Sequence, residues 1–175
     1  MKKFLQLVLI TSLLYVVFLP AQASGQFFFF LEENALVGKE VPEIELPLIG
    51  GETNKLSELI HNQNAIIYFW ARWCPPCRDH LKELEEIQAV FKEKNIKFVL
   101  VGLGETADSA EKFLAKFKIN LPNFADVEEI TMESFDIRGL PTFFYVDAKG
   151  MVVAVEHELL ENYEEILNQN LEKKE

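Results

Sequence analysis

Cys74 and Cys77 are the only cysteines in the chain, and they lie two residues apart in the segment Trp73-Cys74-Pro75-Pro76-Cys77. The pair follows an apolar run, residues 65–70, and precedes a pattern typical of a helix. A cysteine pair at this spacing and position predicts a redox-active dithiol. A helix start offers free backbone N–H groups and the positive end of the helix dipole, and both favour a thiolate. We therefore expect Cys74 to be exposed and nucleophilic, and Cys77, one turn later, to be shielded and to close the disulfide.

The two prolines between the cysteines affect the chemistry of the sulfur. Pro75 and Pro76 carry no N–H, so of the amides that normally cap this position only that of Cys77 can donate to Cys74. A thiolate at Cys74 is then less stabilised than one that receives several amides. We expect a moderate thiol pKa and a fairly reducing disulfide.

Metal and haem chemistry are the main alternatives for such a cysteine pair. A zinc site needs about four ligands, whereas the chain has no second cysteine pair and only three histidines, which are His61, His80 and His157. Covalent haem attachment fails because Arg78, not histidine, follows Cys77. Copper delivery through both cysteines and His157 remains an alternative, and a peroxidase is disfavoured because no cysteine precedes the pair. We expect no metal and no cofactor beyond the Cys74–Cys77 disulfide.

The N-terminus has the features of a secretory signal. Lys2 and Lys3 precede an apolar stretch over residues 4–19, and Ala21-Gln22-Ala23 forms a cleavage pattern. We expect residues 1–23 to be a signal peptide and the mature protein to be periplasmic or otherwise extracytoplasmic. An uncleaved membrane anchor is the alternative. The apolar run Phe27–Leu31 either extends an interfacial segment or packs on the mature domain. Residues 24–37 form a lead-in segment, and residues 38–175 form one domain.

Charge and length limit the function classes. The chain has 175 residues and a formal net charge of −11. Cleavage after Ala23 makes it more acidic, since the signal segment holds two lysines and no carboxylate. Such a chain is a poor candidate for binding nucleic acid. The length suits a single domain with a full core, and we expect a monomer.

Periodicity predicts strands alternating with helices. The expected strands are 41–46, 64–70, 96–103, 142–146 and 151–155, and residues 147–150 form a hairpin turn. The expected helices are 55–59, with a serine cap, 75–94, 108–117, 128–135 and 161–171. This order predicts an α/β fold with a central mixed sheet flanked by helices. The cysteine pair then follows the carboxyl end of the first core strand, where open α/β sheets place their sites.

The chain resembles the thioredoxin superfamily, and within it the exported TlpA/ResA-like thiol–disulfide oxidoreductases of cytochrome c maturation. The matching segments cover about residues 38–170 and are Val41–Leu46, Leu56–Leu59, Tyr68–Arg78, Val101–Leu103, Ile137–Phe143 and Asp147–Gly150. The resemblance implies a thioredoxin-like fold with an N-terminal strand or hairpin extension. It also implies that Cys74 is the nucleophile, that Cys77 resolves the mixed disulfide, and that Pro141 is cis beside the dithiol. Leu140 is then free to pair with an extended substrate segment.

The resemblance also implies an activity. We expect a reductase of oxidised cysteines in exported proteins, with apocytochrome c as the favoured substrate and a membrane-embedded thiol protein as the electron donor. A disulfide oxidase or isomerase is the alternative within the class. A metallochaperone that binds one ion through the dithiol is the alternative outside it.

Three positions depart from the pattern of these families. His80 stands where the cytochrome c maturation group usually has glutamate, Lys82 stands where a proline often kinks the helix, and Tyr68 replaces the buried aspartate of thioredoxins. No carboxylate of the family can therefore be assigned as the proton acceptor. His80 lies one helical turn after Cys77, so it is a candidate proton relay, with an inactive helix residue as an equal alternative. We expect Trp73 to shield the dithiol and to contact partners.

Overall fold

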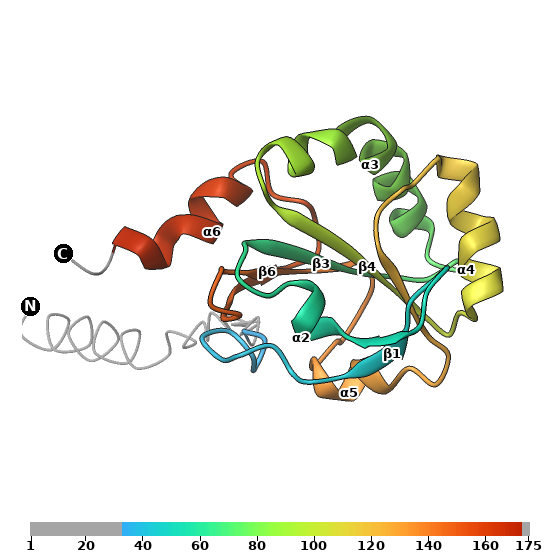
Figure 1. The fold of residues 1–175 in the computed structure, drawn as a ribbon, viewed down its shortest axis with the longest axis horizontal. Helices are drawn as coiled ribbons and strands as arrows, with labels where there is room; N and C mark the ends of the chain where they lie inside the picture. Colours follow the sequence, from blue (N-terminus) through green and yellow to red (C-terminus); the bar gives the residue numbers. More distant parts are fainter. Residues whose placement is uncertain (1–32, 173–175) are drawn as a thin grey trace, which may run out of the picture. The chain divides into compact units, whose positions relative to one another are not determined.

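The computed structural model describes residues 33–172, so the predicted signal peptide and residues 24–32 of the lead-in lie outside the described part. A five-stranded mixed sheet forms its centre, in the order β5-β4-β3-β6-β7 (Figure 1). Its strands are β3 (Ala65–Trp70), β4 (Lys97–Leu103), β5 (Asn123–Asp126), β6 (Thr142–Val146) and β7 (Val152–Glu156). A separate hairpin consists of β1 (Glu45–Pro47) and β2 (Thr53–Lys55).

The apolar runs form the middle of the sheet because both of its faces are covered. Every residue of β3 is buried, and a strand without a solvent face needs no polar alternation. β3 pairs in parallel with β4 and antiparallel with β6. The carboxyl ends of β3, β4 and β5 and the start of β6 therefore meet at one edge of the sheet, and the cysteines follow β3 at that edge.

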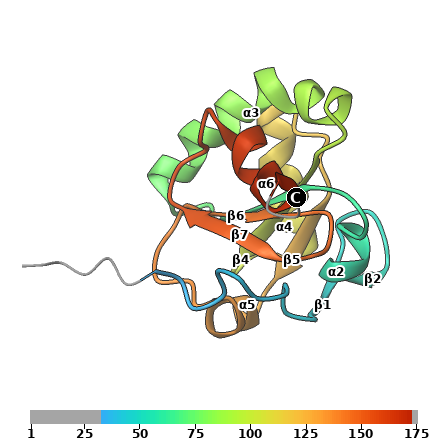
Figure 2. The same cartoon turned by 90° about the vertical axis from the view of Figure 1, so that its left-hand side faces the viewer.

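Helices cover the two faces of the sheet (Figure 2). One face carries α3 (Pro75–Glu93), α4 (Ala107–Leu114) and α6 (Tyr163–Glu172), and the other carries α2 (Leu56–Leu59) and α5 (Ile130–Ser134). Tyr68 and Trp70 point into the first layer, whereas Phe69 packs against Phe135 and Phe144 in the second. Burying large aromatic side chains on both faces contributes roughly 2–3 kcal/mol each.

The long elements confirm the sequence predictions. The predicted strands 64–70, 96–103, 142–146 and 151–155 and the helix 75–94 all form, with ends shifted by at most one residue, and so does the turn between β6 and β7. The hairpin of β1 and β2 confirms the predicted N-terminal extension. The predicted strand 41–46 is mostly extended chain, and only its last two residues pair in β1.

Two local predictions were wrong, and one strand was not predicted. The sequence reading did not identify β5, whose four residues form a strand because they pair with β4. Ser57 does not cap α2, since Lys55 holds the capping position without a side-chain bond and Ser57 Oγ contacts Glu43. The helix predicted over 108–117 ends at Leu114 and continues as a 3-10 turn, η1 (Ala115–Phe117).

Residues 33–37, the described end of the lead-in, contact the domain. Asn34 donates from its side-chain amide to the carbonyl oxygens of Phe135 and Asp136, at 2.9 and 3.1 Å. Within residues 33–172, none of the helices has the length and apolar content to cross a membrane.

Candidate active site

Cys74 and Cys77 form a disulfide at the start of α3, with their α carbons 5.3 Å apart. Cys74 is the N-cap residue, and its sulfur accepts a hydrogen bond from the Cys77 amide at 3.2 Å. Pro75 and Pro76 occupy the first two positions of the helix, where the absent N–H groups are tolerated. A single amide therefore caps the Cys74 sulfur, as the sequence predicts.

The prediction that Cys74 is exposed is wrong for the disulfide form. The residue is only 2% exposed, and Cys77 is fully buried. The reason is the direction of the Cys74 side chain, which turns back toward the helix, where its sulfur bonds to Cys77 and accepts the Cys77 amide.

The segment before β6 approaches the same site with an open backbone edge. The Leu140–Pro141 bond is cis, as the resemblance implies, and Leu140 packs against the cluster that holds both cysteines. The carbonyls on either side are occupied, since Gly139 O accepts the Thr142 hydroxyl at 2.6 Å and Pro141 O contacts His157 Nδ1 at 2.7 Å. Among the described residues, nothing bonds to the N–H or C=O of Leu140.

The predicted site-shaping residues divide into surface and core. Trp73 is 68% exposed, and Pro75 and Pro76 are also exposed, so these three side chains form surface next to the disulfide. Trp70 is buried beneath the site, where it donates to Asn123 at 2.9 Å and stacks on Phe113. Trp73 is therefore an exposed aromatic side chain beside the disulfide, whereas Trp70 belongs to the core.

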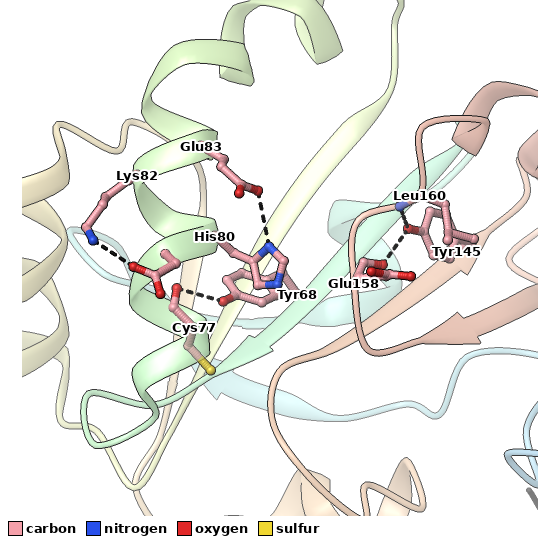
Figure 3. A network of polar contacts seen from close by, with 9 residues as sticks. Tyr68, Cys77, His80, Lys82, Glu83, Tyr145, Glu158 and Leu160 are labelled. Carbon is pink, nitrogen blue, oxygen red and sulfur yellow. Dashed lines mark hydrogen bonds and ion pairs between the residues drawn. The ribbon is translucent and has the colours of Figure 1, made fainter.

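Tyr68 and His80 flank the inner side of Cys77 (Figure 3). The Tyr68 hydroxyl donates to the Cys77 carbonyl at 3.0 Å, and its ring stacks on Phe143 with centroids 4.5 Å apart. His80 packs edge-on against both rings, and its Nδ1 lies 3.3 Å from a Glu83 carboxylate oxygen. The position that holds a carboxylate in thioredoxins thus carries a neutral hydroxyl, with an imidazole next to it.

We predict that Tyr68→Phe lowers the free energy of unfolding by about 1 kcal/mol at pH 7, because one buried hydrogen bond is lost. Burial raises the pKa of Tyr68 well above its usual value of 10. The folded state therefore keeps this proton when the unfolded chain releases it, so the stabilisation is complete below pH 10 and falls as the pH rises further. Urea unfolding at pH 7 and 10.5 measures both effects. If the difference in free energy of unfolding between wild type and Tyr68→Phe is as large at pH 10.5 as at pH 7, burial does not raise the pKa of Tyr68.

Glu105 is a site residue that the sequence reading missed. It follows β4, is only 1% exposed, and accepts from the backbone N–H and the Nε of Arg72, both at 3.2 Å, and from the Ser109 hydroxyl at 2.7 Å. Arg72 stands two residues before Cys74, whose amide donates to Ala71 O at 3.1 Å. Glu105 therefore holds the turn that precedes Cys74. A glutamate two residues after a buried strand was the available signal.

We predict that Glu105→Ala destabilises the oxidised protein by about 2–3 kcal/mol, since it leaves the Arg72 amide and the Ser109 hydroxyl without their partner. Glu105→Gln keeps an acceptor oxygen and loses only an ion pair whose arginine is half exposed, so about 1 kcal/mol is expected. Urea unfolding of the three oxidised proteins compares them. Equal losses of unfolding free energy in Glu105→Ala and Glu105→Gln would show that the charge of Glu105, and not its hydrogen bonds, holds the turn.

No group of three or more His, Cys, Asp or Glu side chains is arranged to hold a metal ion within residues 33–172.

Known proteins are similar to this chain in sequence and in fold. Residues 37–155 match the AhpC/TSA family. The thiol–disulfide oxidoreductase ResA of Geobacillus kaustophilus is 29% identical over 87% of each chain, and that of Bacillus subtilis is 27% identical over 85% of this chain and 79% of its own. A crystal structure of a putative thiol:disulfide interchange protein DsbE from Chlorobium tepidum is 30% identical, covers 77% of this chain and 94% of its own, and has a TM-score of 0.64. With its disulfide capping α3 at the carboxyl edge of the sheet, the chain belongs to the AhpC/TSA family of the thioredoxin superfamily and is a thiol–disulfide oxidoreductase.

Proposed function

We propose that the protein is an exported reductase that opens disulfides in exported proteins. The observation that carries the direction of electron flow is the single amide on the Cys74 sulfur. A thiolate that accepts one hydrogen bond is less stabilised than a thiolate that accepts several. The reduced form of the protein is then less stabilised relative to the disulfide form, so the disulfide is a weaker oxidant.

The reaction proceeds by two thiol–disulfide exchanges. The Cys74 thiolate attacks one sulfur of the substrate disulfide, a Cys74–substrate disulfide forms, and the released substrate sulfur takes up a proton. Cys77 then loses its proton and attacks the Cys74 sulfur, which releases the second substrate thiolate. Two electrons have passed to the substrate, and Cys74 and Cys77 are left as the disulfide seen in the structure. A dithiol donor must reduce this disulfide before the next cycle.

An open backbone edge supports a protein substrate. An extended segment that carries the target cysteine can pair with the N–H and C=O of Leu140, which have no partner among the described residues. The exposed Trp73 ring offers apolar contact to the same segment. Recognition through the backbone suits a range of sequences, as a reductase of unfolded exported proteins requires.

The substrate and the donor follow from the resemblance. Apocytochrome c is the substrate that the resemblance to the cytochrome c maturation reductases implies. The electron donor is a membrane-embedded thiol protein, since an exported dithiol lies in an oxidising compartment. The protein acts as a monomer, with its disulfide edge open to both partners in turn.

Equilibration with glutathione buffers tests the direction. We expect a reduction potential below about −230 mV, nearer to thioredoxin than to disulfide isomerase. A potential of about −120 mV would identify an oxidase. It would contradict the proposed direction of electron flow but not the thiol–disulfide exchange itself. Metal bound stoichiometrically to the purified reduced dithiol would favour the metallochaperone instead.

Trapping tests the substrate. Cys77→Ala leaves Cys74 to form mixed disulfides that nothing resolves, so tagged protein should retain its partners until a reductant is added. We expect exported cysteine-containing proteins, with apocytochrome c among them. The matched control is Cys74→Ala, which removes the attacking sulfur and should retain none. Retention of cytoplasmic proteins alone would contradict an exported function.

Export itself is tested at the N-terminus. We predict that the mature protein begins at Ser24, because Ala21-Gln22-Ala23 follows a short apolar core. N-terminal sequencing of protein from the native host measures this. A chain that starts at Met1 and sediments with membranes would indicate an uncleaved anchor.

A further inference from the structure

His157 directly follows the edge strand β7, which pairs with β6, and it bonds to the segment that presents Leu140. Its Nδ1 lies 2.7 Å from the Pro141 carbonyl oxygen. A carbonyl oxygen only accepts, so Nδ1 carries the proton and donates it. The bond therefore joins the end of β7 to the residue that follows Leu140.

The backbone that carries His157 is fixed on both sides. β7 ends at Glu156, and the buried Tyr145 holds the following residues, because its hydroxyl donates to Glu158 O at 3.3 Å and accepts from Leu160 N at 2.8 Å (Figure 3). Burial raises the pKa of Tyr145 to about 12, so the hydroxyl keeps the proton that it donates. The backbone on both sides of the exposed His157 is therefore held by hydrogen bonds.

The consequence lies in which backbone groups remain open. Thr142 occupies the carbonyl of Gly139, and His157 occupies the carbonyl of Pro141. Leu140, between them, keeps both of its backbone groups open among the described residues. Without His157, the Pro141 carbonyl would be a second open acceptor, and the contact between Pro141 and the residue after β7 would be lost, although β6 stays paired with β7.

We propose that His157 is a positioning residue that fixes Pro141 and so presents the Leu140 backbone to a polypeptide substrate. The inference rests on the proposed function, because it assumes a protein disulfide as substrate. The proposal assigns His157 no part in the sulfur chemistry. Replacing His157 should therefore not change the rate at which a disulfide without a peptide backbone is reduced.

Two substrates and three variants test this role. Insulin offers a disulfide within a polypeptide, whereas hydroxyethyl disulfide has no peptide backbone. For His157→Ala we expect the KM for insulin to rise about fivefold, the effect of one lost hydrogen bond, with kcat and the rate with hydroxyethyl disulfide unchanged. His157→Asn places an amide nitrogen where Nδ1 stood, and it should restore most of the KM.

The matched control is His61→Ala, since His61 is also exposed and its side chain, within residues 33–172, hydrogen-bonds only to the neighbouring Asn62. It should leave both substrates unaffected. An unchanged insulin KM in His157→Ala, an equal loss with both substrates, or a His157→Asn variant as impaired as the alanine would each overturn the proposal. Failure of the proposed function is distinct, because it would appear in the wild-type protein itself, either as a potential of about −120 mV or as reduction of neither substrate.

Discussion

Replacing Cys74 with serine is expected to reduce insulin disulfide reduction to the rate of the buffer control. The serine hydroxyl fills nearly the same space at the N-cap, so the fold is kept, but it is not ionised near neutral pH and cannot attack a disulfide. Cys77 cannot substitute, because it is fully buried one turn into α3. No other cysteine exists in the chain.

Cys77→Ser should fail differently. Cys74 still attacks, but the mixed disulfide is not resolved, so the variant should accumulate covalent complexes with substrate that disappear on addition of a reductant. Non-reducing electrophoresis and mass spectrometry separate the two outcomes. If Cys77 alone reacts with iodoacetamide in the reduced wild-type protein at neutral pH, the two roles are reversed.

The assignment of these roles depends on features that are local in sequence. The N-cap position of Cys74 and the lack of N–H groups on Pro75 and Pro76 involve four consecutive residues, so the single-amide cap was predictable before any fold was known. The buried strands β3 and β4 were equally predictable, because an uninterrupted apolar run needs cover on both faces.

The contacts that support the site were not predictable in the same way. Glu105 reaches Arg72 across 33 residues and His157 reaches Pro141 across 16, so each contact exists only once the strands have paired in register. β5 has polar residues at both ends and no alternation, and pairing with β4 makes it a strand. The Glu105 contact, the His157 contact and strand β5 all depend on tertiary pairing, which a single sequence does not show.

His80 is where the second large effect is expected. His80→Ala should slow disulfide reduction at pH 6–7 on the order of 10²-fold, the lower end of general acid–base contributions. When Cys77 attacks the mixed disulfide it must first lose a proton, and an imidazole one turn away can accept it directly or through water. The Glu83 contact at Nδ1 favours the tautomer with a proton there, which leaves Nε2 as the acceptor.

The same change should alter the pH at which the dithiol reacts. A protonated imidazole stabilises a nearby thiolate, so its removal should shift the alkylation profile of the active-site thiols to higher pH. His80→Glu should retain activity, since a carboxylate can also accept a proton, but its negative charge opposes thiolate formation and also shifts the profile upward. Initial rates of iodoacetamide alkylation from pH 5 to 9 measure these shifts.

Glu83→Gln provides the matched control for the charge next to His80. The amide oxygen still accepts from Nδ1, and the lost charge belongs to a side chain that is 64% exposed and therefore screened. The pH profile of alkylation in Glu83→Gln should lie close to the wild-type profile, whereas the profile of His80→Ala should be shifted to higher pH. Superimposable curves for wild type and His80→Ala would make His80 a helix residue without a role, and the proton would then pass from Cys77 to water. In that case the neutral Tyr68 hydroxyl beneath Cys77 would leave this site with no fixed base, and reduction should slow steadily as the pH falls below neutral.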